Sequence, residues 1–171
     1  PAKVAADVVA TAFELAKKLK KVPVRAGVCD GFIGNRILTR YRQTADILLA
    51  EGATPSSIDA AMRGFGMAMG PYEAQDMSGL DIAYANRQRQ RLDGRADARM
   101  LPILECLVEE HGRLGRKSMA GWYDYDDAGR LRPSALVEAR LARYSTPTAR
   151  AIGSAAHGLM KPSGSDPETE P

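Results

Sequence analysis

Apolar residues recur at helical spacing through most of this chain. From residue 3 to residue 21 they return every three or four positions, and lysines close the segment. A second run extends from Gly31 to Glu51 and is followed by Gly52, where a left-handed helix end favours glycine. Both runs predict amphipathic helices. The buried stripe predicted for the second is Ile33, Ile37, Tyr41, Ala45 and Leu48.

Shorter helical patterns follow, and the fold class they indicate is mainly α. One helix is expected after Thr54, and another from Pro71 past Gly79 to about Arg91. Two more are expected at 101–112 and 133–144. Only two segments, 22–26 and 122–125, read as extended. Three methionines near the second glycine cluster are expected to fill the core: Met62, Met67 and Met69.

The two ends of the chain differ from its middle. One helix followed by one short strand cannot form a sheet, so residues 1–28 are predicted to be the end of an α/β domain. The absence of an initiating methionine before Pro1 suggests a piece of a longer chain. Residues 147–171 are rich in Pro, Gly and Ser and are expected to be a disordered tail or linker.

Composition narrows the function classes. The 171 residues carry a net charge of +3, with both signs interspersed. The densest basic run, 87–95, has no aromatic residues for stacking, so no nucleic-acid partner is expected. No apolar run approaches the length of a membrane span, so no membrane partner is expected.

The reactive side chains form no recognisable catalytic or metal pattern. Cys29 and Cys106 are too few for a disulfide framework, which favours a reducing compartment, and we expect a cytoplasmic location. His111 and His157 have no neighbouring ligand pattern, so no metal is expected. On one continuous helix Asp76 and Asp81 would lie about 140° apart, which disfavours an acid–base pair.

Without further information, a helical interaction module would be the default interpretation. The glycines at 64, 66 and 70 follow a helix and have the wrong spacing for a dinucleotide loop.

Four ordered stretches change that interpretation. Residues 29–36 resemble the D-x-P-G-F-hydrophobic-x-N-R signature of 3-hydroxyacyl-CoA dehydrogenases, and residues 65–73 are similar to G-x-x-M-G-P-F-E. Residues 76–81 are similar to D-x-x-G-L-D. Residues 114–125 are similar to F-G-x-K-x-G-x-G-F/W-Y-x-Y. The order and spacing are the family's, and details such as Gly-Trp-Tyr-Asp-Tyr resemble its multifunctional branch, in which a hydratase/isomerase half precedes the dehydrogenase.

The resemblance implies a fold and a domain plan. The expected fold is the helical C-terminal domain of this family, similar to that of 6-phosphogluconate dehydrogenase. Residues 1–28 would be a helix–strand remnant of the Rossmann NAD-binding domain, and residues 29–126 the helical domain. Residues 127–146 would form a connector helix.

The resemblance also implies chemistry. The family oxidises (3S)-3-hydroxyacyl-CoA reversibly with NAD in fatty acid β-oxidation, using a His–Glu pair and a glycine-rich NAD loop in the Rossmann part. Neither occurs in this chain. Asn35 matches a family asparagine near the substrate oxygen, and Lys117 matches a lysine on the nicotinamide side of the cofactor. The fragment alone would therefore be inactive.

Two departures and one alternative accompany this assignment. Asp30 replaces a proline before Gly31, and Met119 stands where the family pattern has glycine, a change expected to loosen the loop of Lys117. The expected partners are an acyl-CoA substrate, the Rossmann domain and a second copy in a homodimer or pseudo-dimer. The alternative is a non-catalytic helical dimerisation module.

Overall fold

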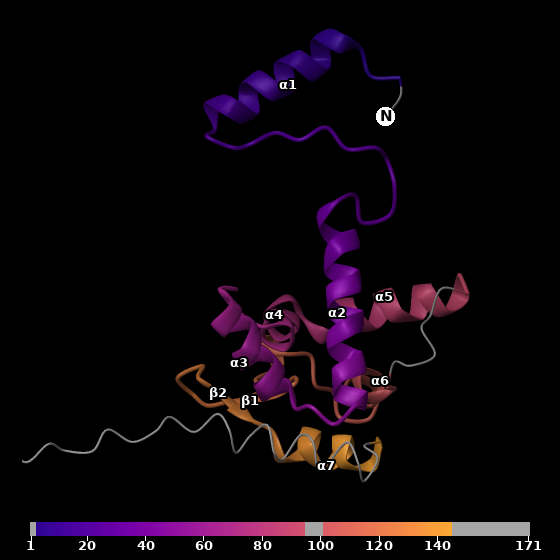
Figure 1. The fold of residues 1–171 in the computed structure, drawn as a ribbon, viewed down its shortest axis with the longest axis vertical. Coiled ribbons are helices and arrows are strands. Elements are labelled where there is room, and N and C mark those ends of the chain that lie inside the picture. The colour runs from indigo at the N-terminus through magenta and orange to yellow at the C-terminus, as the bar shows by residue number, and fades with distance from the viewer. Residues whose placement is uncertain (1–2, 95–100, 145–171) are drawn as a thin grey trace, which may run out of the picture. The chain divides into compact units, whose positions relative to one another are not determined.

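A computed structural model describes residues 3–94 and 101–144, and it divides the chain into two units, residues 1–41 and 42–171. Figure 1 shows the order of the elements along the chain. The predicted tail at 147–171 lies outside the described residues. The fold is mainly α, as predicted. None of the described helices is both long and apolar enough to cross a membrane.

The first unit contains α1 (Ala6–Lys18) and the first turns of α2 (Gly34–Ala50). No residue of α1 is buried, and Val8 and Leu15 on its apolar side are exposed. The strand predicted at 22–26 is wrong, because a strand is stabilised by ladder hydrogen bonds and no described segment pairs with these residues.

Helix α2 begins later and buries a different face than the pattern predicted. Ala45 is buried as expected, but Ile33, Ile37 and Leu48 are exposed, and Tyr41 is only half-buried. The other buried positions are Gln43, Asp46 and Leu49. The prediction failed because the buried face includes a carboxylate and an amide, which a search for apolar positions ignores. Gly52, at φ 101°, ends the helix as predicted.

Short helices form most of the second unit. Thr54 caps α3 (Pro55–Phe65), accepting a hydrogen bond from the backbone N–H of Ser57 in a capping box. The single helix predicted from Pro71 to Arg91 is wrong. It is two helices, α4 (Pro71–Ser78) and α5 (Leu80–Leu92), which meet at Gly79 with φ 101°.

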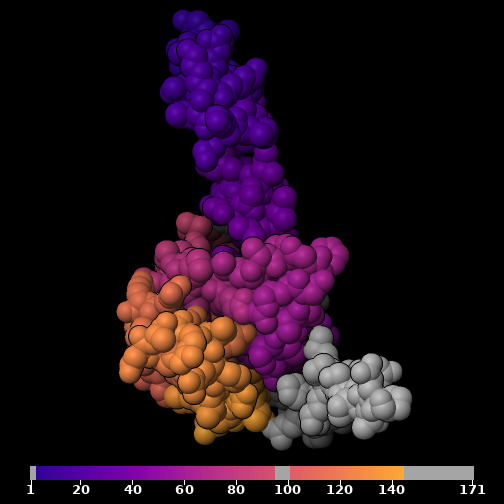
Figure 2. All heavy atoms as spheres, turned by 90° about the vertical axis from the view of Figure 1, so that its left-hand side faces the viewer, coloured from indigo at the N-terminus to yellow at the C-terminus, as the bar shows by residue number. Residues whose placement is uncertain are grey.

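The C-terminal elements complete the second unit. Helix α6 (Ile103–Glu109) precedes the short 3-10 helix η1 (Arg116–Ser118). Strand β1 (Tyr123–Tyr125) pairs antiparallel with β2 (Leu131–Pro133), and α7 (Ala135–Tyr144) follows. On the face drawn in Figure 2, the magenta α3–α4 region lies beside the orange region of the hairpin and α7.

One apolar core joins these elements. Trp122 and Tyr72 lie at its centre, with ring centroids 4.7 Å apart and edge to face. Val137 and Leu141 of α7 belong to the same core. The methionines do not fill it as expected: Met67 is exposed, and Met62 and Met69 are half-buried.

A buried ionic cluster lies beside the apolar core. Arg87 of α5 donates to Asp46 of α2 at 2.6 Å and to Glu105 of α6 at 3.1 Å. The Tyr72 hydroxyl donates to the same Asp46 carboxylate at 3.2 Å. Burial raises the pKa of Asp46, against the opposing charge of Arg87. The cluster therefore ties three helices together through charge.

Candidate functional site

Lys117 lies on η1, with its ammonium group at the surface of the second unit. Its Nζ donates to Oδ2 of Asp81, in the first turn of α5, at 2.6 Å. The two side chains are 51% and 46% exposed, so the pair is reachable from solvent. The hydrogen bond from Lys117 holds the pKa of Asp81 below its usual range. The site thus offers a cation held in place by a carboxylate that stays ionised.

The loop that carries Lys117 folds against a buried aspartate, Asp76 of α4. Gly115 and Gly121 flank the loop, and a side chain on either would collide with Asp76. The Asp76 carboxylate accepts hydrogen bonds from the backbone N–H groups of Trp122 and Tyr123, at 2.8 Å and 3.0 Å. Both ends of the loop are therefore fixed on one residue.

The pKa of the Asp76 carboxyl group is well above its usual value. The side chain is buried, and burial raises its pKa from 3.8 to about 6, although the hydrogen bonds from Trp122, Tyr123 and the Tyr125 hydroxyl oppose the shift. Both oxygens of the Asp76 carboxylate accept hydrogen bonds from these three donors. We therefore interpret Asp76 as a residue that positions the backbone of Trp122 and Tyr123.

Asp59 of α3 serves the neighbouring helix in the same way. Its carboxylate accepts the backbone N–H groups of Tyr72 and Glu73, both at 2.9 Å, at the start of α4. The Tyr123 hydroxyl donates to it at 2.6 Å. A side chain at Gly70 would collide with Asp59. This glycine packs against a carboxylate, whose negative charge would disfavour a phosphate at this position.

Met119 shows why the family pattern has glycine at its position. Its φ of 56° and ψ of 13° place it in the left-handed region, which costs a residue with a side chain about 1–2 kcal/mol. The Met119 N–H donates to the Arg116 carbonyl, and the Met119 carbonyl accepts from the Tyr125 N–H. Two backbone hydrogen bonds therefore hold the loop at Met119.

Asn35 lies in the first turn of α2, in the other unit. Its side chain is exposed, and its amide makes no hydrogen bond within the described part of the chain. Its backbone carbonyl accepts from the Thr39 hydroxyl at 2.8 Å. The side-chain amide is therefore available to donate to, or accept from, a ligand.

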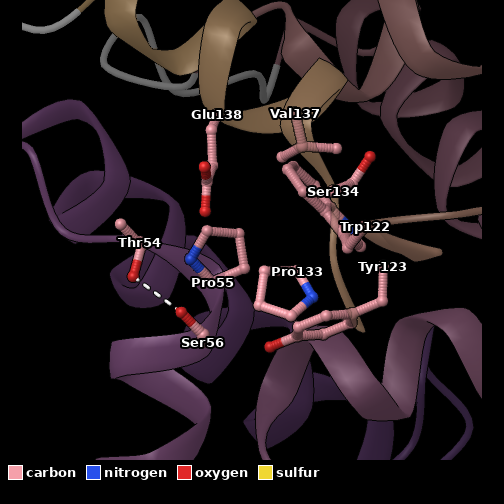
Figure 3. A pocket seen from close by; sticks show the side chains of 9 residues that line it. All are labelled: Thr54, Pro55, Ser56, Trp122, Tyr123, Pro133, Ser134, Val137 and Glu138. Carbon is pink, nitrogen blue, oxygen red and sulfur yellow. Dashed lines mark hydrogen bonds between the residues drawn. The ribbon is translucent and has the colours of Figure 1, made fainter. Parts of the chain in front are cut away.

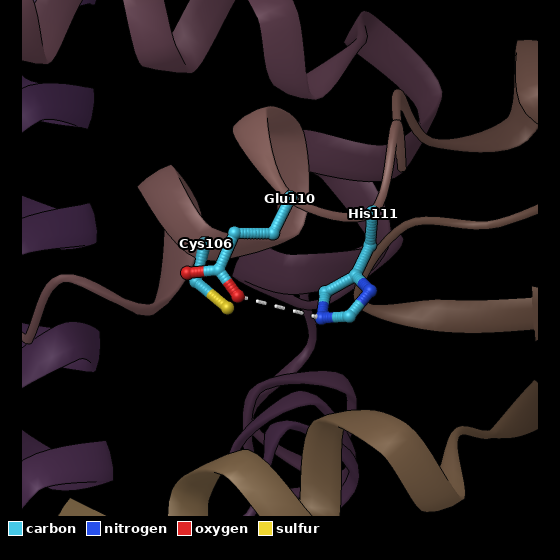
Figure 4. A group of neighbouring side chains, drawn as sticks. All are labelled: Cys106, Glu110 and His111. Atoms are coloured by element: carbon cyan, nitrogen blue, oxygen red, sulfur yellow. Dashed lines mark ion pairs between the residues drawn. The ribbon is translucent and has the colours of Figure 1, made fainter.

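A second group of donor atoms gathers at the C-terminal end of α6 and in the residues that follow it. Figure 4 shows Cys106, Glu110 and His111, whose ligand atoms lie within 4.8 Å of one another. The Arg140 guanidinium from α7 lies 2.9 Å from both the Glu110 carboxylate and the His111 ring. The Arg140 guanidinium thus already pairs with Glu110 and His111 and joins α7 to the segment that follows α6.

The small pocket in Figure 3 offers no reactive chemistry. It lies between the first turn of α3 and the residues around β2 and α7. Thr54 and Ser56 form a hydrogen bond with each other at 3.0 Å there, and Glu138 of α7 also lines the pocket. Its remaining walls are mainly aromatic, aliphatic or proline side chains. We therefore interpret it as a small gap between packed elements rather than a binding site.

Only part of a dinucleotide site can be built from the described residues. Lys117 supplies an exposed cation on a hydrogen-bonded loop, which fits one edge of an anionic or polar cofactor. No described strand leads into a glycine-rich turn and helix, the arrangement that holds a pyrophosphate. The described residues therefore fit NAD only as a source of additional contacts, with the pyrophosphate-binding turn supplied from elsewhere.

Comparison with known proteins agrees with the fold and the motifs. Residues 31–125 match the family described as 3-hydroxyacyl-CoA dehydrogenase, C-terminal domain. The peroxisomal bifunctional enzyme of Cavia porcellus is 40% identical over 149 residues, which cover 80% of this chain and 20% of that protein. The chain therefore spans about one fifth of the length of such relatives.

Solved structures give the same picture. The dehydrogenase part of multifunctional enzyme 1 from C. elegans superposes with a TM-score of 0.62 at 31% identity, over 81% of this chain and 31% of that one. The (S)-3-hydroxybutyryl-CoA dehydrogenase of Ralstonia eutropha gives 0.62 at 31% identity, over 73% of this chain and 45% of that one.

The expected cytoplasmic location is wrong. Several relatives are named peroxisomal or glyoxysomal enzymes, which points to the peroxisome. The cysteine content led to the error, because it reports the redox state of a compartment and cannot identify the organelle.

Proposed function

This chain belongs to the 3-hydroxyacyl-CoA dehydrogenase family through the family's C-terminal domain, and from that membership we propose that it is the substrate-side domain of an NAD-dependent (3S)-3-hydroxyacyl-CoA dehydrogenase. The observation that carries the proposal is the match over residues 31–125, because it includes both Asn35 and Lys117. The dehydrogenase would act in a β-oxidation enzyme of the multifunctional type.

We assign two residues to the reaction. Asn35 would donate its amide N–H to the substrate oxygen on which negative charge develops, or orient the catalytic base through its amide oxygen. Its exposure, without a hydrogen bond inside the described chain, supports this role. Lys117 would contact the nicotinamide side of the cofactor with its exposed ammonium group.

NAD, when bound, accepts the hydride from the substrate carbon. The His–Glu pair that takes the hydroxyl proton and the glycine-rich loop would come from a Rossmann domain outside these 171 residues, for which residues 1–28 would be the final segment. Self-association as a homodimer or pseudo-dimer is part of the same proposal, and exposed apolar side chains such as Phe65 and Met77 support it.

The test compares two proteins in one assay. Reduction of acetoacetyl-CoA by NADH is followed for the 171-residue chain and for the intact parent protein that contains it. We expect turnover only from the intact protein, because the chain has neither base nor dinucleotide loop. Turnover by the purified 171-residue chain would show that the chemistry is assigned to the wrong part, and an inactive intact protein would contradict the proposal itself.

A further inference from the structure

We infer that the two aspartates of the 76–81 segment position Lys117: Asp76 fixes the loop that carries it, and Asp81 fixes its ammonium group. This inference rests on the proposed cofactor role of Lys117 and deepens it. Asp76 and Asp81 are positioning residues in this account, because they act through Lys117 rather than on the reacting atoms.

The first step concerns the ammonium group. A lysine side chain has four flexible methylenes, so an exposed lysine samples many positions. The 2.6 Å hydrogen bond to Asp81 selects one of them. It uses one of the three N–H donors of the ammonium, and about half of the side chain remains accessible to a ligand.

The second step concerns the corner on which this pair lies. Gly79, between α4 and α5, has φ 101°, and a side chain there would come within 3.3 Å of Lys117 Nζ and 2.5 Å of Asp81 Oδ1. The pair therefore occupies space that exists because residue 79 lacks a side chain. The break between the two helices also places Asp81 in a first turn, where the backbone can bend toward the loop.

The third step concerns the loop itself. The Leu80 N–H donates to the carbonyl of Leu114 at 3.2 Å, so the start of α5 is hydrogen-bonded to the start of the loop. At the other end, the Asp76 carboxylate holds the backbone of Trp122 and Tyr123. One segment of six residues thus controls both the backbone and the charged end of Lys117.

Fold stability does not account for the Asp81–Lys117 pair. Exposed ion pairs contribute little to the free energy of unfolding, because water screens them and both side chains lose freedom. A cation that is already ordered, by contrast, loses less entropy when a ligand binds. The pair should therefore affect ligand affinity more than unfolding.

The experiment measures NADH binding and steady-state kinetics in the intact parent protein. Asp81→Asn should weaken NADH binding about three- to tenfold, as expected for one ordered charged contact, with the KM for acetoacetyl-CoA and the melting temperature nearly unchanged. Lys117→Ala should weaken NADH binding at least as much, and adding Asp81→Asn to Lys117→Ala should have no further effect. Asp81→Glu should restore most of the affinity.

Asp127→Asn is the matched control, because Asp127 is an exposed aspartate in the β1–β2 turn and its loss changes the net charge equally. The rate at which an amine reagent labels Lys117, followed by mass spectrometry, reports whether Asp81 holds the ammonium group. This rate should increase in Asp81→Asn, because the ammonium group loses its hydrogen-bond acceptor. This labelling needs neither bound NADH nor turnover.

The outcomes separate the inference from the proposed function. If Lys117→Ala weakens NADH binding and Asp81→Asn does not, positioning is refuted and the cofactor role stands. If the two changes add independently, Asp81 does not act through Lys117. If neither change alters NADH binding while turnover stays normal, both roles are wrong, but the dehydrogenase assignment survives. A large fall in the melting temperature of Asp81→Asn would make the pair structural and overturn the inference.

Discussion

Replacing Arg87 by leucine should strongly destabilise the helical unit. The guanidinium joins α5 to α2 and α6 through Asp46 and Glu105, and the paired side chains are at most 10% exposed. It also donates to the backbone carbonyl of Leu101 at 3.0 Å. The substitution leaves two buried carboxylates and one carbonyl without this donor.

The size of the effect follows from burial. Breaking a buried ion pair by removing one partner costs about 3–5 kcal/mol, because the remaining charge stays desolvated. Two carboxylates share Arg87, although Arg91 also contacts Glu105 at 2.8 Å and limits the loss there. For a domain of this size the expected fall in melting temperature is on the order of 10 °C.

The loss should depend on pH in a defined direction. Burial already raises the pKa of Asp46, and the positive charge of Arg87 opposes that shift. Without Arg87 the folded-state pKa rises further above the unfolded value, so Asp46 favours folding at low pH and this contribution disappears as pH rises through the folded pKa. The destabilisation should therefore be larger at pH 7–8 than at pH 4–5.

Urea unfolding at several pH values measures the effect. Arg89→Leu, two residues along the same helix but exposed, is the control and should change stability by about 0.5 kcal/mol or less. Changing Asp46, Arg87 and Glu105 together to leucine should recover much of the stability lost in the single variant. A loss below about 1 kcal/mol for Arg87→Leu, or a loss independent of pH, would refute the reasoning about buried charge.

Two further predictions concern Asn35 and Asp76. In the intact enzyme Asn35→Ala should lower kcat about 10²–10³-fold, as for removal of one oxyanion donor, with little change in melting temperature, whereas Thr39→Ala on the same helix should cost much less; near-normal kcat would remove the catalytic assignment. The pKa of Asp76 is raised from 3.8 to about 6, so its contribution to folding is present below about pH 4 and disappears as pH rises through 6, a change of about 3 kcal/mol. Stability measured from pH 4 to pH 7 should accordingly fall less steeply in Asp76→Asn, and an identical slope would show that Asp76 does not titrate in this range.

Much of the local structure followed from the sequence. Thr54 with Pro55 defined the start of α3, and Gly52 defined the end of α2, because caps depend on neighbours a few residues away. The mainly α class followed from periodicity in the same way. The family motifs added Asn35 and Lys117, whose surroundings the local pattern alone could not supply. The domain boundaries stay a prediction.

Other features depended on distant partners. The 22–26 segment has strand composition but forms no strand in the described residues, because pairing requires a neighbour. Leu48 and Leu49 look equivalent in the sequence, yet only Leu49 is buried, since the side of α2 that faces the core is set by what packs on it. The sequence predicts Asp76 and Asp81 on one continuous helix, but the break at Gly79 places them on separate helices.

The sequence by itself therefore determined the mainly α class, the start of α3, the end of α2, the family, and the two residues proposed for chemistry, because these depend on local order and motif. Only the tertiary structure decided which charges are buried and what they hold. Asp46 joins Arg87 across 41 positions, and Asp76 reaches Trp122 across 46. Such pairs carry no local signature, because a carboxylate has the same sequence letter whether it faces water or two buried N–H groups, and only the folded chain sets its surroundings.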